Sequence, residues 1–179
     1  MIFRETTVVG AWVIEPERLA DERGFFARTW DGAEFAARGL TAGLVQCSLS
    51  HTRVRGTLRG LHYQTAPHEE AKLVRCTAGA IFDVALDLRP DSPTFKRWFG
   101  VELSAENRLA LYVPEGCAHG LLTLMDDSEV LYQMSAADAP DAASGVRFDD
   151  PAFGIQWPAP VVVINDRDRG YPDFESAVS

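Results

Sequence analysis

The segment covering residues 58–74, LRGLHYQTAPHEEAKLV, concentrates side chains that can bind metal ions or move protons. Its seventeen positions hold one arginine, two histidines, two glutamates and one lysine. Histidine and glutamate are common metal ligands, whereas histidine close to cationic side chains also suits proton transfer on an anionic substrate. The segment therefore permits two interpretations, a metal site or a metal-free acid–base site.

A second segment bears on this choice. Residues 113–124, VPEGCAHGLLTL, contain the pattern Pro114-x-Gly116-x-x-His119. The pattern resembles the second motif of the cupin superfamily, whose fold is a small jelly-roll barrel and whose histidine commonly binds a metal ion. The resemblance implies that His119 points into such a barrel.

The first cupin motif ends in two histidines and a glutamate, followed by six residues and a glycine. Counting back from Gly79, Lys72 occupies the glutamate position, His68 the second histidine position and Ala66 the first. A lysine ammonium has no lone pair to offer and repels a divalent cation. The metal interpretation of residues 58–74 therefore fails on charge, and neither a metal nor a cofactor is expected.

The remaining residues resemble one cupin family closely, the dTDP-4-dehydrorhamnose 3,5-epimerases, which act on nucleotide-linked 4-keto-6-deoxy sugars. The resemblance covers most of the chain in order. It rests on DERGFF (21–26), GTLRGLHYQ (56–64), AKLVRCTAGAIFDVALDLRPDSPTF (71–95), LSAEN (103–107), VPEGCAHG (113–120), EVLYQ (129–133), GVRFDDPAFGIQWP (145–158) and NDRD (165–168).

The resemblance implies epimerisation through an enolate. A ketone at carbon 4 acidifies the hydrogens on carbons 3 and 5, and a proton returned to the opposite face inverts the centre. In the family pattern His62 is the base, Asp168 its carboxylate partner and Tyr132 the acid on the far face. Imidazole titrates near ~6.5 and suits proton abstraction at neutral pH. Lys72 falls where the family has the cation that stabilises the enolate oxygen.

The resemblance also implies a set of substrate-binding residues. Arg23 and Arg59 match groups that bind the pyrophosphate, for which a planar bidentate guanidinium is well suited. His119 lines the same pocket, and Asp83 is expected to orient either His119 or Lys72. The other positions assigned to substrate binding are Phe26, Gln46 and Ser48.

Spacing alone leaves other interpretations of these residues open. Tyr132 alternates with Val130 and fits a packed strand, Asp168 fits a turn, and an isolated His62 fits a structural role. Three other functions also stay open: a nucleotide-sugar ketoisomerase, a non-catalytic nucleotide-sugar-binding cupin and a metal-dependent oxygenase. The presence of an acid and a base together favours the epimerase, because a binding protein needs neither.

Several positions depart from the family pattern. The family commonly has an aromatic residue where this chain has Leu19, tyrosines at Ala137 and Asp138, and an asparagine at Ser48. The loop 51–55 is one residue longer than in the commonest rhamnose enzymes. Because the aromatic residues hold the nucleotide, a dTDP-linked substrate is expected but the base, the sugar and the inverted carbons stay open.

These residues must be positioned by short strands with few helices. KLVRCTAG (72–79) and AIFDVALDLR (80–89) predict a hairpin around Gly79, with Asp83 and Asp87 on the same face. DGAEFAARG (31–39) predicts a helix with a capping box formed by Asp31 and Glu34. Further strands are predicted at GVEL (100–103), LALYVP (109–114), HGLLTLM (119–125), SEVLYQM (128–134) and PVVVIN (160–165). The predicted fold is mainly β, a cupin-type jelly-roll barrel with a few short helices, in a single domain of residues 1–179.

Composition narrows the setting in which the protein works. The chain has 179 residues, a net charge of −9 and no apolar run of membrane-spanning length, so neither nucleic-acid nor membrane binding is expected. The basic cluster around Arg59 and Lys72 instead fits a small anionic ligand. Three cysteines without short spacing favour a reducing, cytoplasmic location. A homodimer is expected from the resemblance, with the segment before Asp21 adding to the sheet of the partner.

Overall fold

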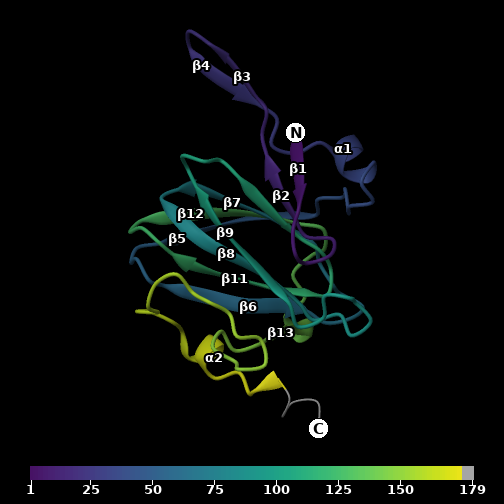
Figure 1. The fold of residues 1–179 in the computed structure, drawn as a ribbon, viewed down its shortest axis with the longest axis vertical. Helices are drawn as coiled ribbons and strands as arrows, with labels where there is room; N and C mark the ends of the chain where they lie inside the picture. Colours follow the sequence, from purple (N-terminus) through teal and green to yellow (C-terminus); the bar gives the residue numbers. More distant parts are fainter. Residues whose placement is uncertain (175–179) are drawn as a thin grey trace.

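The structure is a computed structural model that describes residues 1–174. In this part of the chain two antiparallel sheets face each other, and a two-stranded hairpin projects from them (Figure 1). The larger sheet contains, in spatial order, β1 (Ile2–Glu5), β2 (Trp12–Glu15), β10 (Ala110–Val113), β7 (Lys72–Ala78), β12 (Ser128–Met134) and β5 (Gln46–Thr52). The smaller sheet contains β13 (Ala143–Gly145), β6 (Leu58–Gln64), β11 (Cys117–Thr123), β8 (Ala80–Asp87) and β9 (Trp98–Ser104). The hairpin consists of β3 (Arg18–Asp21) and β4 (Gly24–Ala27).

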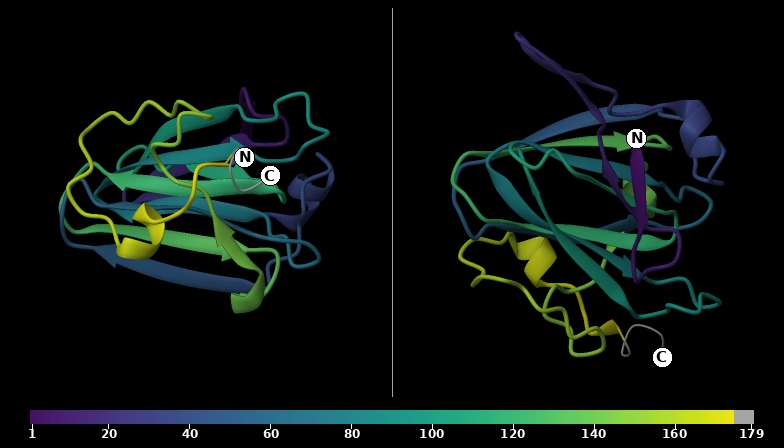
Figure 2. Two further views of the ribbon diagram at one scale, coloured as in Figure 1. Left: turned by 90° about the horizontal axis from the view of Figure 1, so that it is seen from below. Right: turned by 45° about the horizontal axis from the view of Figure 1, so that its top comes forward.

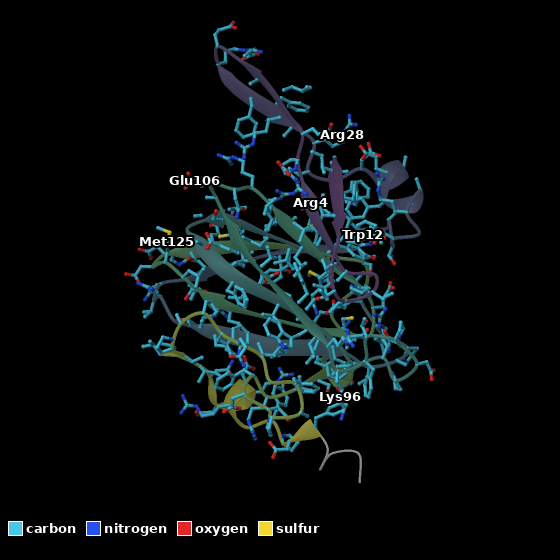
Figure 3. The ribbon with its side chains drawn as sticks, in the orientation of Figure 1. Arg4, Trp12, Arg28, Lys96, Glu106 and Met125 are labelled. Atoms are coloured by element: carbon cyan, nitrogen blue, oxygen red, sulfur yellow. The ribbon has the colours of Figure 1, made fainter. Side chains whose placement is uncertain are left out.

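The main core lies between the two sheets. Side chains fill this space in Figure 3, and the buried residues come from strands of both sheets, among them Val74 and Leu111 from the larger and Ile81 and Leu121 from the smaller. This alternation of inward apolar residues predicts a closed, barrel-like sandwich. The mainly β prediction is thereby confirmed.

The predicted helix is present, although shorter than expected. α1 covers Gly32–Ala36, and the Asp31 side chain caps it by accepting hydrogen bonds from the amides of Ala33 and Glu34 at 3.0 and 3.1 Å. Phe35 is the apolar anchor of this helix, 1% exposed in a second core cluster on the outer face of the larger sheet. Gly39 adopts a φ of +70° just beyond the helix, as a helix stop signal predicts.

The prediction that residues 72–89 form a hairpin is wrong in its pairing, although both strands are present. β7 pairs with β10 and β12 in the larger sheet, whereas β8 pairs with β9 and β11 in the smaller one. The chain changes sheets at Gly79, which has a φ of +70°. A Cβ atom at this position would lie 2.5 Å from the hydroxyl oxygen of Ser128, so only glycine fits the crossing. The predicted faces are confirmed, because Ile81 and Ala85, on the same face as Asp83, belong to the inter-sheet core.

The strand predicted at residues 160–165 is wrong. Val163 makes only an isolated bridge to Thr57, and Val162 donates one backbone hydrogen bond to the Gly56 carbonyl. Both valines are largely exposed, at 67% for Val162 and 43% for Val163. The segment passes over the end of β6 without joining a sheet, which β-branched composition alone cannot reveal.

The C-terminal part of the described chain packs beside the smaller sheet. Figure 2 shows this segment, in yellow-green, running along one side of the barrel, and it contains the short helix α2 (Asp166–Arg169). A 3₁₀ helix, η1 (Pro140–Ala142), precedes β13. Within residues 1–174, no helix combines the length and the apolar character needed to cross a membrane.

Candidate active site

Strand β6 carries two of the predicted site residues, Arg59 and His62. In a regular strand, side chains three positions apart point to opposite faces. Here the pairing of β6 with β11 shifts between His119 and Leu121, so that His62 lies opposite His119 and Arg59 lies opposite Leu121. Because His119 and Leu121 share a face of β11, the irregularity directs both β6 side chains to the same side of the sheet.

Gly60 makes this irregularity possible. Its φ is +121°, and a Cβ atom at this position would lie 2.5 Å from the Cα atom of Gly120 on the neighbouring strand. Any larger residue would push β6 and β11 apart. The Gly60 amide donates a 2.9 Å hydrogen bond to Oδ2 of Asp168, which links the bulge directly to the predicted catalytic carboxylate.

His62 and Asp168 form a hydrogen-bonded pair. The distance between His62 Nε2 and Asp168 Oδ1 is 2.7 Å. The Asp168 side chain is 1% exposed, whereas that of His62 is 41% exposed, so the imidazole stands between the buried carboxylate and the open site. Burial alone would raise the pKa of Asp168, but the hydrogen bonds from His62 and the Gly60 amide outweigh it and hold this pKa below its ordinary value.

Asp168 is held by a short helix and not by the turn that its local sequence suggested. It lies in α2, whose N-cap residue Asn165 accepts a 2.7 Å hydrogen bond from the Asp168 amide. The signal NDRD contains both the cap residue, which accepts the hydrogen bond, and the residue whose amide donates it, so capping rules could have predicted the helix. The approach of α2 to β6 could not be predicted from local sequence, because the two elements are far apart along the chain.

His119 and Asp83 form a second pair inside the barrel. Nε2 of His119 lies 2.8 Å from Oδ1 of Asp83, and the two side chains are 6% and 0% exposed. Burial raises the pKa of Asp83 above its ordinary value, and the nearby His119 opposes this effect. Of the two roles expected for Asp83, the contact supports orientation of His119.

Tyr132 faces His119 from the larger sheet. The two rings meet edge to face with centroids 6.0 Å apart. The Tyr132 hydroxyl lies 3.4 Å from the hydroxyl of Ser50. Burial raises the pKa of Tyr132 to about 12, so the phenol keeps its proton at neutral pH. A phenol that keeps its proton until the enolate forms on the substrate can act as a general acid.

Lys72 begins β7 and is 9% exposed. Its Nζ atom lies 2.7 Å from Oε1 of Glu70, and both side chains are 11% exposed. The positive charge of Lys72 also acts through space on Asp83 and, like His119, opposes the rise in the pKa of Asp83 that burial causes. The cation therefore lies near the barrel interior, with a carboxylate in direct contact that the sequence had not singled out.

The Arg59 side chain extends from β6 of the smaller sheet to β5, the edge strand of the larger sheet. Arg59 Nε donates to the Thr52 hydroxyl at 3.1 Å, and its guanidinium also interacts with Tyr132 through space. Ser48 is the register partner of Tyr132 on the neighbouring strand. Gln46, for which substrate binding stays a prediction, accepts a hydrogen bond from the amide of Asp138 through its side-chain oxygen and so fixes the loop after β12.

Arg23 and Phe26 are not brought to this site by their own chain. Both lie on the β3–β4 hairpin, which projects away from the barrel in Figures 1 and 2. Arg23 pairs with Asp21 of the same hairpin, and its side chain is 83% exposed. The Phe26 residue is 69% exposed. In Figure 3 the tip of the hairpin stands clear of the body, above the labelled Arg28, whereas closer to the barrel Arg18 donates to the Glu106 carbonyl and Arg108 lies over the Phe25 ring.

The structure adds residues that sequence reasoning missed. The Tyr171 ring lies edge to face with the His62 ring, with the ring centroids 6.5 Å apart. A Cβ atom at position 145, occupied by Gly145, would lie 2.4 Å from carbon atoms of the Tyr171 ring. Tyr171 follows α2 and therefore closes one side of the base, but nothing in its spacing indicated this. Within the described part of the chain, no group of three or more His, Cys, Asp or Glu side chains is arranged to hold a metal ion.

Comparison with known proteins identifies the family. The family model described as dTDP-4-dehydrorhamnose 3,5-epimerase matches residues 5–176. A dTDP-4-dehydrorhamnose 3,5-epimerase from Methanothermobacter thermautotrophicus is 45% identical over 172 residues, covering 94% of this chain and 92% of the relative.

Solved structures show the same fold over almost the whole length. The dTDP-4-dehydrorhamnose 3,5-epimerase from Elizabethkingia anophelis has a TM-score of 0.95 at 36% identity, covering 98% of this chain and 97% of that one. ChmJ, a 3′-monoepimerase from Streptomyces bikiniensis in complex with dTDP-quinovose, has a TM-score of 0.87 at 34% identity, covering 97% and 88%. The predicted cupin-type fold is thereby confirmed. The chain belongs to the dTDP-4-dehydrorhamnose 3,5-epimerase family.

Proposed function

We propose that the protein inverts carbon 3, carbon 5 or both in a dTDP-linked 4-keto-6-deoxyhexose, through an enolate. The observation that carries this proposal is the arrangement of a base and an acid on opposite sheets. His62 lies on β6 of the smaller sheet, and Tyr132 lies on β12 of the larger sheet. His119 pairs with His62 on the neighbouring strand, and its ring packs against the Tyr132 ring. A sugar ring between them would meet a base on one face and an acid on the other.

The hydrogen bonds of His62 identify the nitrogen that acts. Nε2 donates to Asp168, which leaves the lone pair of Nδ1 available. We propose that Nδ1 removes the proton from the carbon next to the ketone, and that the electron pair moves onto the carbonyl oxygen. Asp168 then stabilises the imidazolium that forms.

The second half of the reaction returns a proton to the other face. Tyr132 gives its hydroxyl proton to the carbon as the carbonyl re-forms. The resulting phenolate recovers a proton from solvent, and the His62 imidazolium releases its proton to solvent. Lys72 stabilises the negative charge on the enolate oxygen during the interval. Arg59 binds the pyrophosphate at the exposed end of the site.

We further propose a homodimer in which the hairpin of one copy completes the site of the other. Leu19, Phe25 and Phe26 are 69%, 43% and 69% exposed on two strands that have no other sheet to join. An isolated hairpin of this kind is marginally stable in water and needs a packing partner. The sequence placed the contribution to the partner in the segment before Asp21, which includes the edge strand β1. We propose in addition that the hairpin of residues 18–27 enters the partner's site.

Mixing two inactive variants tests the exchange of hairpins. Arg23→Ala and His62→Ala subunits would each be inactive alone. In a dimer with exchanged hairpins, a mixed dimer contains one site with both native residues, so co-refolding restores activity. Failure to regain activity, or a monomer by light scattering at micromolar concentration, would reject the exchange.

Solvent exchange tests the chemistry itself. The protein is incubated with dTDP-4-keto-6-deoxyglucose in heavy water, and carbons 3 and 5 are followed by NMR. Deuterium at both positions indicates inversion through both enolates, and deuterium at one indicates a monoepimerase. A product whose carbonyl has moved to carbon 3 would instead identify a ketoisomerase, and no exchange at all would reject the enolate mechanism.

Two predictions from composition stay predictions. Residues 1–179 are proposed to form one domain, in keeping with strands that alternate between the two sheets along the chain. The proposed cytoplasmic location is supported by Cys47, Cys76 and Cys117, which are all free thiols.

A further inference from the structure

Glu70 belongs to the charged segment of residues 58–74, yet the epimerase chemistry assigns it no role. Its carboxylate lies 2.7 Å from the Lys72 ammonium, in a position where both side chains are 11% exposed. A surface ion pair contributes little, because solvent screens it and both side chains are free to move. This pair is mostly shielded from solvent and involves the cation that the proposed mechanism needs, so its geometry matters more than that of a surface pair.

The backbone between the two residues is fixed. The Ala71 amide donates to the Ser135 hydroxyl at 2.8 Å, and the Ser135 amide donates to the Ala71 carbonyl at 3.0 Å. Ala71 itself is 2% exposed in the core cluster beneath α1. Glu70 and Lys72 therefore flank a residue that cannot shift easily, and their side chains meet from a defined backbone.

The other carboxylate near Lys72 is already engaged elsewhere. Asp83 accepts from His119 through Oδ1, while its Oδ2 is buried without a hydrogen-bond partner among the described residues. Lys72 therefore acts on Asp83 only through space. The direct contact that determines where the Lys72 ammonium points is the one with Glu70.

We propose that Glu70 is a positioning residue that directs the Lys72 ammonium toward the enolate oxygen. This inference rests on the proposed function. Lysine has three N–H donors on a flexible four-carbon chain, so one fixed acceptor restricts where the other two donors point. Without that acceptor the ammonium would sample several rotamers, and the preorganised stabilisation of the enolate would be lost.

The carboxylate charge of Glu70 is not the useful property in this arrangement. A negative group next to the developing enolate repels it and offsets part of the attraction from Lys72. The benefit must come from the position of the acceptor oxygen, which an amide reproduces. Glu70→Gln and Glu70→Ala therefore separate position from charge.

The experiment measures the rate of carbon–hydrogen exchange in heavy water for both variants. Glu70→Ala is expected to lower kcat by about tenfold, less than the ~10²–10⁴-fold of a lost acid–base group because Lys72 itself remains, with KM little changed. Glu70→Gln is expected to stay close to the wild-type rate or to exceed it. Glu69→Ala, a change in the exposed neighbour, is the matched control and should leave both constants unchanged.

A double-mutant cycle with Lys72→Met identifies the group through which Glu70 acts. In that background Glu70→Ala should cause no further loss of rate, because the position of the acceptor matters only while Lys72 is present and removal of a repelling carboxylate does not slow enolate formation. An additional loss in the Lys72→Met background, or equal rates for Glu70→Ala and the wild type, would overturn the proposal. A loss of dTDP binding in Glu70→Ala would overturn it as well, since positioning of Lys72 affects kcat and not ground-state binding. Absence of exchange in the wild type would instead reject the epimerase function.

Discussion

His62 and Asp168 are 106 positions apart in the sequence, and their side chains are joined by a 2.7 Å hydrogen bond. The second oxygen of Asp168 accepts the Gly60 amide, so the carboxylate is held between the base and the strand that carries the base. This double attachment fixes the imidazole ring with Nε2 toward Asp168. The orientation of the catalytic base therefore depends on a four-residue helix near the C-terminus.

His62→Ala should nearly abolish exchange at both carbons. General acid–base groups contribute ~10²–10⁴-fold each, and no other described histidine is hydrogen-bonded to Asp168. The measurement is deuterium incorporation per folded molecule. His68→Ala, in the exposed loop after β6, is the control and should exchange at the wild-type rate. Near-wild-type exchange in His62→Ala would show that another group is the base.

Asp168→Asn should lower the rate by ~10²–10⁴-fold, although the side chain keeps its shape. An amide nitrogen facing Nε2 would favour the tautomer with the proton on Nδ1, and the lone pair that accepts the substrate proton would be lost. Dissociation of dTDP, followed by titration calorimetry, should change little. A rate within threefold of the wild type would show that the carboxylate is not needed.

The same substitution should also alter stability in acid. The pKa of Asp168 is depressed in the folded protein, so its contribution to the free energy of unfolding is fully present above about pH 4, the unfolded pKa, and is lost as the pH falls through the folded pKa. The wild type should therefore be more stable than Asp168→Asn near pH 7, and the difference should shrink below about pH 4. Urea denaturation at several pH values measures this, and a constant difference across that range would contradict it.

Much of the fold could be predicted from the spacing of apolar residues and from turn residues, whereas the arrangement of the site depended on contacts between distant parts of the chain. The face of β8 that carries Asp83 and the cap of α1 at Asp31 follow from local rules, and both are confirmed. The change of sheet at Gly79 could not be predicted, because a tight turn between two strands also fits a hairpin. The bulge that directs Arg59 and His62 to one side depends on the close approach of Gly120, which no local pattern encodes.

The contacts between site residues were likewise hidden. Their identities came from the resemblance to a family, and spacing alone favoured structural roles for Tyr132 and Asp168. The pairing of Lys72 with Glu70 needed no long-range contact, since Glu70 lies two positions before Lys72, just ahead of β7. It was missed because a glutamate near a lysine is usually a solvated pair, and only burial shows otherwise.

Tyr132→Phe should separate exchange from inversion. The Tyr132 hydroxyl is the proposed proton donor on the face opposite His62, and burial keeps it protonated by raising its pKa to about 12. The variant should still exchange the substrate hydrogen through His62 while inversion falls by about 10²-fold or more. The ratio of inversion to deuterium incorporation measures the effect. An unchanged ratio would remove Tyr132 from the mechanism.

Asp87→Asn should destabilise the protein without changing its catalysis. Asp87 is completely buried, and although burial would raise its pKa, hydrogen bonds from Arg89, Ser92 and Thr94 lower it to about 2. At about 1.4 kcal/mol per unit, the shift corresponds to roughly 2 kcal/mol of stability at neutral pH. This contribution is present above about pH 4 and is lost only as the pH falls toward 2.

Denaturant melts of Asp87→Asn should therefore show a lower free energy of unfolding at pH 7 and a smaller difference near pH 3. Asp91→Asn, an exposed acid in the loop after β8, is the matched control and should lie within experimental error of the wild type. The kcat per folded molecule should be unchanged in both, because Asp87 ends β8 and its side chain hydrogen-bonds to the loop that follows, not to His62 or Tyr132. A wild-type stability for Asp87→Asn would refute the role of this network.

The final prediction concerns recognition of the nucleotide. Arg59→Ala should weaken dTDP binding strongly, because the guanidinium is proposed to bind the pyrophosphate. Discrimination between bases should be modest, because Ala137 and Asp138 stand where relatives commonly have stacking aromatic rings, each worth ~0.5–1.5 kcal/mol beyond area burial. The loop that carries them is held by Gln46 and Gln64, and it borders an open hollow of about 390 Å³ lined by Thr65, Ala66, His68, Ala139, Pro140, Asp141 and Ala142.

Competition binding with dTDP, UDP, CDP and GDP measures this discrimination, and Ala137→Tyr provides the matched gain of function. A tyrosine at position 137 restores a stacking surface beside the hollow, so it should tighten binding of every nucleotide by a few fold and should leave the effect of Arg59→Ala unchanged. Asp138→Asn should also tighten binding slightly, since it removes a negative charge near an anionic ligand. A wild-type preference for dTDP above about a hundredfold, ~2.7 kcal/mol, would show that other residues have rebuilt the base pocket and that the lost aromatics are compensated.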